Sequence, residues 1–331
     1  MAKTSDQEIK QGRRRKIVRR VLFGSAALGL PVLLQSMVKR RARQLDPVVW
    51  GEPKELAAED GKVLYQDLGS GSSGRPPIVL LHSFGPGHSG LHWRGVAEIL
   101  GQRNRVIVPD LLGWGESDRP ALRYDAELYV DLLRSILVDL LGEKAWVIAS
   151  GRTASIAARV AATRSDLFAG LGMVAPRGLE RRRDKPDLRD TLLHSVLRMP
   201  LFGDSALTAV NSRTAIAQHL RREIFHDAEL AEARIDEHYR NSHLPGAGRA
   251  LAAAVCGRLD LQLSQAELEG LSIPVWIAWG REAQSPSMTN ADLWLRHLPS
   301  AELSLFDDAA SHPHLEAPAA FAEGLESFLD R

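Results

Sequence analysis

One stretch decides the fold of this chain: Ala145-Trp146-Val147-Ile148-Ala149-Ser150-Gly151-Arg152-Thr153-Ala154-Ser155-Ile156-Ala157-Ala158. Its first half is an apolar run typical of a buried strand, and its second half is rich in alanine and typical of a helix. Small residues, Ala149 and Thr153, stand two positions on either side of Gly151 and let the backbone turn sharply there. The stretch therefore predicts a strand, an abrupt turn with Gly151 at its apex, and a helix that leaves close to the strand.

Short apolar runs recur along the chain and alternate with helical patterns. They occupy residues 78–81, 105–108, 171–175, 273–279 and 302–306. A hairpin is predicted earlier, around Asp60-Gly61. Because strands that are apolar throughout are buried on both faces, this alternation predicts a mostly parallel sheet with helices on both sides.

The segment from about 179 to 270 has no strand pattern and is rich in arginine and helical sequence. It lies between two predicted core strands. We therefore expect one domain over residues 48–331, with this segment inserted as a helical cap above the carboxyl ends of the strands, where ligands bind in such sheets.

Composition narrows the function classes. The chain has 331 residues, 44% hydrophobic and 25% charged, with a net charge of +1. The basic residues concentrate in the first forty-odd positions, so the body is mildly acidic and no nucleic-acid partner is expected. A single cysteine, Cys256, excludes an intrachain disulfide and a cysteine-based metal site.

The N-terminus predicts a membrane anchor. Residues 1–16 form a basic tail that we expect to be disordered, and residues 21–38 are uncharged. As a helix this run spans roughly 27 Å, close to the thickness of a bilayer core. Basic residues flank both of its ends, so an anchor helix is predicted over 17–43.

Two alternatives to a single span stay open. Glycines, a proline and Gln35 within the run suit an interfacial helix, and Arg19-Arg20 faintly resembles an export signal. As a single span or an interfacial helix, the run makes membrane lipid the expected partner. The side of the membrane on which the body lies is left open.

Three further stretches are similar to the α/β-hydrolase family. Residues 82–85, His-Ser-Phe-Gly, resemble that family's oxyanion loop, with Ser83 in place of a glycine. Residues 110–120, Asp-Leu-Leu-Gly-Trp-Gly-Glu-Ser-Asp-Arg-Pro, are very similar to its Asp-x-x-Gly-x-Gly-x-Ser-Asp-x-Pro loop. Residues 311–318, Ser-His-Pro-His-Leu-Glu-Ala-Pro, resemble the segment around its catalytic histidine. The resemblance covers roughly residues 48–331 and implies a capped α/β-hydrolase fold.

The family's chemistry needs a nucleophile, a histidine and an acid. The resemblance places all three roles on residues whose side chains cannot perform them. The nucleophile position of the sharp turn falls on Gly151. The acid position falls on Ala283, and the histidine position on Ser311. This predicts a fold that has lost its usual catalytic residues.

A displaced set of catalytic residues is the alternative. Ser150, Glu282 and His312 each lie one residue from the family position. An active set would need every member to shift, and it would put Arg152 where the turn demands a small residue. The discriminating geometry is a hydrogen bond between Ser150 and His312.

The remaining pocket candidates are Ser83, Phe84 and Arg152, at the predicted oxyanion loop and the start of the helix. The spacing of His82, His88 and His92 suits no familiar zinc motif, so no metal site and no cofactor are expected. The sequence therefore predicts a membrane-anchored pseudo-hydrolase that binds an apolar small molecule or a membrane protein. The alternative is an active esterase or lipase-like serine hydrolase that acts on apolar substrates derived from the membrane.

Overall fold

The computed structural model describes residues 36–38, 40–42, 44–48, 50–69, 74–179, 195, 197, 207–208 and 211–330. The predicted basic tail, 1–16, and most of the predicted anchor helix, 17–43, lie outside these residues. Within the described part, no helix combines the length and the apolar character needed to cross a bilayer.

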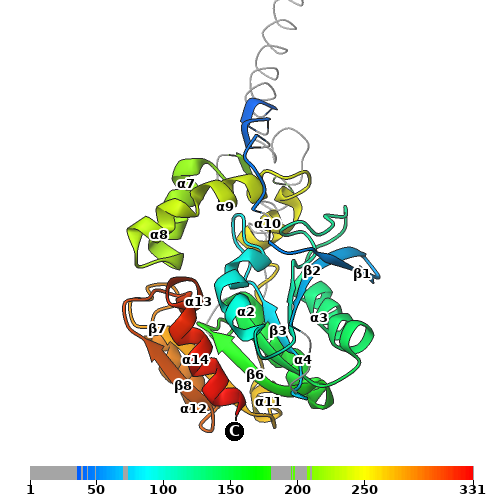
Figure 1. Cartoon of the computed structure of the whole chain (residues 1–331), viewed down its shortest axis with the longest axis vertical. Coiled ribbons are helices and arrows are strands. Elements are labelled where there is room, and N and C mark those ends of the chain that lie inside the picture. Colours follow the sequence, from blue (N-terminus) through cyan, green and yellow to red (C-terminus); the bar gives the residue numbers. More distant parts are fainter. Residues whose placement is uncertain are drawn as a thin grey trace, which may run out of the picture.

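Eight strands form one twisted sheet at the centre of the molecule (Figure 1). The order across the sheet is β1-β2-β4-β3-β5-β6-β7-β8. Strands β3 to β8 are parallel, and β1 and β2 form an antiparallel hairpin at one edge. The strands are β1 (Lys54–Ala58), β2 (Gly61–Leu68), β3 (Ile78–Leu81), β4 (Val106–Pro109), β5 (Ala145–Ser150), β6 (Phe168–Val174), β7 (Val275–Gly280) and β8 (Glu302–Phe306).

The mostly parallel sheet predicted from the sequence is confirmed. In β3 and β5 the apolar side chains divide between the two faces: Val79 and Val147 join one core cluster, and Leu80 and Ile148 join the other. The predicted hairpin forms as well, since Ala58 pairs with Gly61. Burial on both faces explains why these strands carry no alternation of polar and apolar residues.

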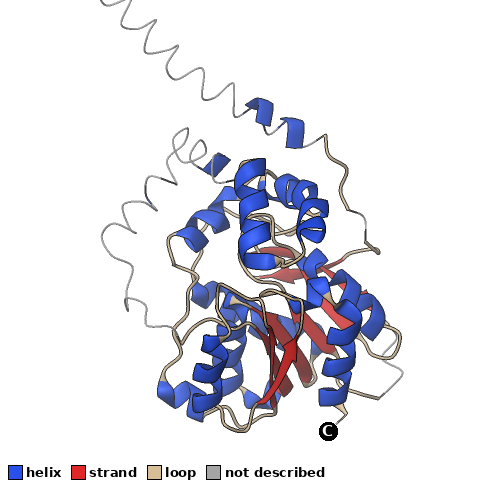
Figure 2. Ribbon diagram, turned by 90° about the vertical axis from the view of Figure 1, so that its left-hand side faces the viewer, coloured by secondary structure: helices blue, strands red, loops and turns tan. Residues whose placement is uncertain are grey.

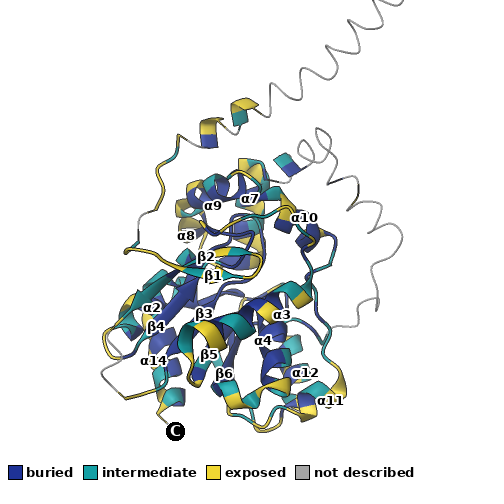
Figure 3. Cartoon of the chain, turned by 90° about the vertical axis from the view of Figure 1, so that its right-hand side faces the viewer, coloured by how far each residue is buried: buried dark blue, intermediate teal, exposed yellow. Residues whose placement is uncertain are grey.

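Helices cover the two faces of the sheet (Figure 2; Figure 3). Trp93, Phe321 and their neighbours on α2 and α14 fill the core on one face, whereas α3, α4 and α12 cover the other. The helices of these layers are η1 (Gly90–Trp93), α2 (Arg94–Leu100), α3 (Ala126–Ser135), η2 (Ile136–Leu141), α4 (Arg152–Thr163), η3 (Ser165–Leu167), α11 (Gln265–Glu269), α12 (Thr289–His297), α13 (Pro313–Glu316) and α14 (Pro318–Leu329).

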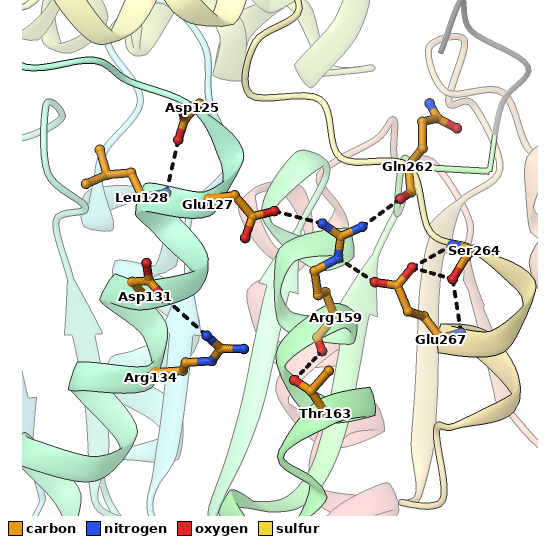
Figure 4. A network of polar contacts seen from close by, with 10 residues as sticks. All are labelled: Asp125, Glu127, Leu128, Asp131, Arg134, Arg159, Thr163, Gln262, Ser264 and Glu267. Atoms are coloured by element: carbon orange, nitrogen blue, oxygen red, sulfur yellow. Dashed lines mark hydrogen bonds and ion pairs between the residues drawn. The ribbon is translucent and has the colours of Figure 1, made fainter. Parts of the chain in front are cut away.

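A network of polar contacts holds α4, the helix that follows the sharp turn (Figure 4). The guanidinium of Arg159 donates to Glu267 on α11 at 2.5 Å, to Glu127 on α3 at 2.9 Å and to the carbonyl of Gln262 at 3.0 Å. One side chain therefore joins α4 to both neighbouring helices. This fixes the direction in which the chain leaves Gly151.

The described part of the segment between β6 and β7 is helical, as predicted for the cap. Four longer helices lie above the carboxyl ends of the strands (Figure 1). With the short π-helical η4 (Leu220–Ile224), they are α7 (Arg213–His219), α8 (Ala228–Ala233), α9 (Ile235–Ser242) and α10 (Gly248–Val255). At the end of this segment, α11 packs against α4 beside the sheet.

The described residues at the end of the predicted anchor, and Leu45 just after it, lie against this cap. Ala42 is 1% exposed and belongs to the same apolar cluster as Ile216, Leu220 and Tyr239. Val38 and Leu45 pack on the edge of that cluster. The chain entering from residue 38 is therefore joined to the cap before it reaches the sheet.

Candidate functional site

Gly151 forms the apex of the turn between β5 and α4. Its backbone adopts φ 59° and ψ −116°, a region that side chains occupy only with strain and that glycine adopts freely. Its N–H donates to the carbonyl of Val174 at 2.8 Å, which pins the turn to β6. The structure thus places a residue without a reactive side chain at the position that the family resemblance gives to the nucleophile.

The hydroxyl of Ser83 fills the space in front of this apex. A Cβ built on Gly151 would lie 2.5 Å from the Oγ of Ser83 and 3.1 Å from its Cβ. The N–H of Arg152 donates to the same Oγ at 3.2 Å. In an active hydrolase that N–H belongs to the oxyanion hole, so here its acceptor is a side chain of the protein itself.

The side chains of the other two predicted pocket residues, Phe84 and Arg152, make contacts within the fold. Phe84 packs its ring on Trp114 at a centroid distance of 5.5 Å and on Tyr129 at 4.5 Å. The guanidinium of Arg152 forms an ion pair with Asp260 at 2.8 Å. Its positive charge is therefore balanced within the fold.

The displaced set of Ser150, Glu282 and His312 is not assembled. Ser150 is fully buried at the end of β5, where its hydroxyl donates to the carbonyl of Leu81 at 3.3 Å. Glu282 is exposed at the carboxyl end of β7. His312 makes its contact with Ser311 instead. Because Ser150 belongs to the strand, its side chain points into the sheet while the next residue forms the apex.

The positions of the family acid and histidine lie close to the same space. Ala283 is buried and carries no acid, while the Oγ of Ser311 donates to the carbonyl of Glu223. The Nδ1 of His312 lies 2.8 Å from the Oγ of Ser311, and its Nε2 is buried without a partner among the described residues. Burial lowers the pKa of His312 to about 3, which keeps the ring neutral.

A cavity of about 220 Å³ opens beneath the cap at this point. Its wall includes Ser83, Gly151, Ser311 and His312 from the core. The cap contributes Ile224, Leu251, Ala254 and Val255, together with the polar residues His219 and Glu223. A larger cavity of about 310 Å³ lies between the cap and residues 121–124, and none of the predicted catalytic positions lines it.

The structure also brings together three histidines, one of which, His238, no sequence motif connects with the other two. One nitrogen each from His88, His92 and His238 lies within 4.8 Å of the others. Burial lowers the pKa of His238 to about 4 and the pKa of His88 and His92 well below 6.5, so all three rings are neutral. The three rings lie close enough together to hold a metal ion, an arrangement that the sequence did not predict.

The histidine group was missed because His238 lies on a cap helix, 146 residues after His92. A lone histidine on a helix carries no motif. His82, by contrast, lies in the core with both nitrogens paired: Nδ1 donates to the Ser83 carbonyl at 2.8 Å, and Nε2 accepts from the Leu111 N–H at 3.0 Å.

Comparison with known proteins agrees with this fold. The model of the Alpha/beta hydrolase family matches residues 78–324. An uncharacterised protein of Mycobacterium tuberculosis is 28% identical over 304 residues, which cover 88% of this chain and 85% of that protein. The pimeloyl-[acyl-carrier protein] methyl ester esterase of Nitrosomonas europaea is 31% identical over 252 residues, covering 74% and 92%. Among solved structures, the 2-hydroxy-6-oxo-6-phenylhexa-2,4-dienoate hydrolase of Rhodococcus sp. superposes with a TM-score of 0.69 at 17% identity, covering 85% and 99%.

Proposed function

The chain belongs to the α/β-hydrolase family, and we propose that it keeps the family's fold and pocket without the family's serine-based hydrolysis. In this proposal the pocket under the cap binds a small apolar molecule. The observation that carries it is the pairing of Gly151 with Ser83, because the hydroxyl of Ser83 stands where the nucleophile's side chain would begin. A nucleophile's Cβ fits there only if the Ser83 hydroxyl rotates away, which also breaks its hydrogen bond with the N–H of Arg152.

Each remaining part of the catalytic apparatus supports the same conclusion. The acid position is Ala283 and the histidine position is Ser311, so a serine introduced at the apex would have neither a base nor a group to orient that base. The N–H of Arg152, expected in the oxyanion hole, already donates to Ser83. These three positions therefore offer no catalytic groups, and the function proposed for the pocket is binding alone.

The lining of the cavity indicates the class of ligand. The cap side is mixed: Ile224, Leu251 and Ala254 form a buried apolar part, and His219 and Glu223 form a polar part. Two arginines and one carboxylate reach the cavity, but Arg152 is neutralised by Asp260, and Arg177 donates to Ser285 at 2.9 Å. A volume of about 220 Å³ is below the range of 300–1,000 Å³ that is common for ligand pockets. A small, uncharged, largely apolar molecule fits this wall best.

The proposal also places the protein at a membrane. The uncharged run 21–38 and its basic flanks are the support, and the burial of Ala42 among cap residues is consistent with a tether that joins the body at the cap. A tether entering through the cap would hold the pocket near lipid, the expected source of an apolar ligand. A membrane protein that docks on the cap is the other partner in this proposal.

The test combines binding with recovery of the ligand. Small esters, ketones and fatty acids are screened by thermal shift against the wild-type chain and against Ala254→Phe, which narrows the pocket. Val138→Phe, at an exposed site on η2, is the matched control. We expect at least one apolar compound to stabilise the wild type and the control but not Ala254→Phe, and to be recovered intact after incubation. Recovery of its hydrolysis products would contradict the proposal.

A further inference from the structure

We propose that His88, His92 and His238 form a binding site for a divalent transition-metal ion, with Zn²⁺ the best fit for three imidazole nitrogens. The inference is independent of the proposed loss of serine chemistry. It concerns a second site, next to the pocket, whose ligands come from the core and from the cap.

The spacing of the nitrogens is the first observation. The Nε2 atoms of His92 and His238 lie 3.1 Å apart. Two nitrogens bound tetrahedrally to one zinc ion at 2.0–2.1 Å are about 3.3 Å apart. The third nitrogen, from His88, lies within 4.8 Å of both, so a small movement of one ring completes the set.

The outer contacts of the rings are the second observation. The Nδ1 of His238 lies 2.8 Å from the carbonyl of Pro86, and the Nδ1 of His88 lies 3.2 Å from the carbonyl of Ser83. A carbonyl can only accept, so in both rings Nδ1 carries the hydrogen and Nε2 keeps its lone pair. The Nε2 of His238 faces His92, and the Nε2 of His88 lies 3.5 Å from the Nε2 of His219. Backbone carbonyls fix metal-binding histidines in the same way in known sites.

His92 supplies the third observation. Its Nδ1 is buried without a hydrogen-bond partner in the described part of the chain. Without an ion, its Nε2 must carry the hydrogen toward His238, which leaves Nδ1 as a buried acceptor with nothing to accept from. With an ion on Nε2, the hydrogen moves to Nδ1, where no acceptor lies within reach among the described residues. Nδ1 is therefore unpaired in both states, and the evidence from His92 is that its Nε2 already faces the Nε2 of His238.

The loop is shaped to admit these rings. A Cβ on Gly85 would lie 2.6 Å from the Nε2 of His88. A Cβ on Gly87 would overlap the backbone of His238, so glycine at this position lets α9 approach the loop. Two glycines thus make the space in which histidines from the core and the cap meet.

The surroundings connect the site to the pocket. The Nε2 of His219 on α7 lies 3.5 Å from the Nε2 of His88, and its Nδ1 lies 3.6 Å from the carboxylate of Glu223. His88 and His219 both line the cavity of about 220 Å³. A bound ion would therefore lie beside that cavity and join α9 of the cap to the η1 loop of the core.

Metal binding is measured on the full chain, purified without a histidine tag and stripped with a chelator. Titration calorimetry with ZnCl₂ should show one ion per chain, and Co²⁺ should give the visible absorption of a four-coordinate site. His92→Ala and His238→Ala should each weaken Zn²⁺ binding more than about 100-fold. His297→Ala, at an exposed position on α12, should leave it unchanged.

Two variants on different elements keep the test decisive if one of them fails to fold, as judged by circular dichroism. The Co²⁺ spectrum of the wild type needs no variant at all. The proposal is overturned if the folded wild type binds no Zn²⁺ at 100 µM, or if binding is the same in His92→Ala, His238→Ala and His297→Ala. In the first outcome, His92 and His238 are a hydrogen-bonded pair in the core.

Discussion

The Oγ of Ser83 lies 2.5 Å from the point at which a Cβ on Gly151 would stand. Ser83 and Gly151 are 68 residues apart in the sequence. The side chain of Ser83 fills the space that the absence of a side chain at Gly151 leaves open. The N–H of Arg152 completes the arrangement by donating to the same hydroxyl. The turn is therefore built around Ser83 rather than around a nucleophile.

This relationship predicts how serine at the apex behaves. Gly151→Ser should lower the free energy of unfolding by about 1–3 kcal/mol, because a side chain is strained at φ 59° and meets Ser83 as well. Adding Ser83→Gly removes the contact but not the strain, so the double variant should be more stable than Gly151→Ser alone. Urea unfolding of all four proteins measures the coupling. Strictly additive effects would show that the two residues do not meet.

Neither of these variants should gain esterase activity. Ala283 and Ser311 would leave the new serine without an acid and without a base. Hydrolysis of p-nitrophenyl acetate, measured beside the wild type, is the check. Robust turnover by Gly151→Ser would reveal a base that the placement of Ser311 at the histidine position overlooks.

The buried ring of His82 predicts how stability depends on pH. Burial lowers the pKa of His82 from 6.5 to about 4, and its Nε2 is needed as an acceptor for the N–H of Leu111. The unfolded chain therefore takes up a proton near pH 6.5, which the folded chain does not take up until about pH 4. His82 therefore adds fully to the free energy of unfolding above pH 6.5. This contribution, about 3 kcal/mol in all, is lost as the pH falls from 6.5 to about 4.

His82→Gln separates this effect from the effects of other buried histidines. The substitution removes the titrating ring. The free energy of unfolding of the variant should therefore fall less steeply than that of the wild type between pH 6.5 and 4, although the variant is less stable at pH 6.5. Chemical denaturation across that range gives both slopes. Parallel curves would mean that His82 is not the group responsible.

The contacts of Arg159 predict a difference between two arginines shown in Figure 4. Arg159 joins three partners and its side chain is 25% exposed, whereas Arg134 forms one pair with Asp131 at the surface. We expect Arg159→Met to cost about 1–2 kcal/mol and Arg134→Met less than about 0.5 kcal/mol. Thermal and urea unfolding compare them, and equal losses would show that Arg159 does not anchor α4.

The uncharged run near the N-terminus predicts membrane association. The full chain should sediment with membranes, and Leu28→Lys combined with Leu33→Lys should release it, because two charges in the run oppose insertion. Ser25→Ala is the matched control. Sodium carbonate then distinguishes a spanning helix, which resists extraction, from an interfacial one. A wild-type chain found entirely in the supernatant would contradict the tether.

Much of the fold followed from the sequence because its signals are local. The strand at 302–306 was predicted with the bounds that the structure has, since two leucines and a phenylalanine in a short run between turns need no distant partner to be recognised. The glycine apex at Gly151 was predicted for the same reason. The short helix α11 lies within the segment expected to form the cap, and only the folded chain shows that it packs on α4.

The features that were missed depend on contacts between distant segments. Ser83 was noticed as a substitution in its loop, but only the folded chain shows that its hydroxyl meets Gly151. His238 had no motif to mark it, and its meeting with His92 required the cap to fold over the η1 loop. The placing of Ser150 in the strand also required the structure, because adjacent residues at a sharp turn point in different directions.

The most direct test is labelling of the folded full chain with a fluorophosphonate probe, which reacts with activated serines. Ser150→Ala and Ser83→Ala accompany the wild type, and circular dichroism confirms folding. The account predicts no labelling of the wild type above a heat-unfolded control. Labelling that disappears in Ser150→Ala or in Ser83→Ala would identify a working nucleophile and contradict the loss of serine chemistry.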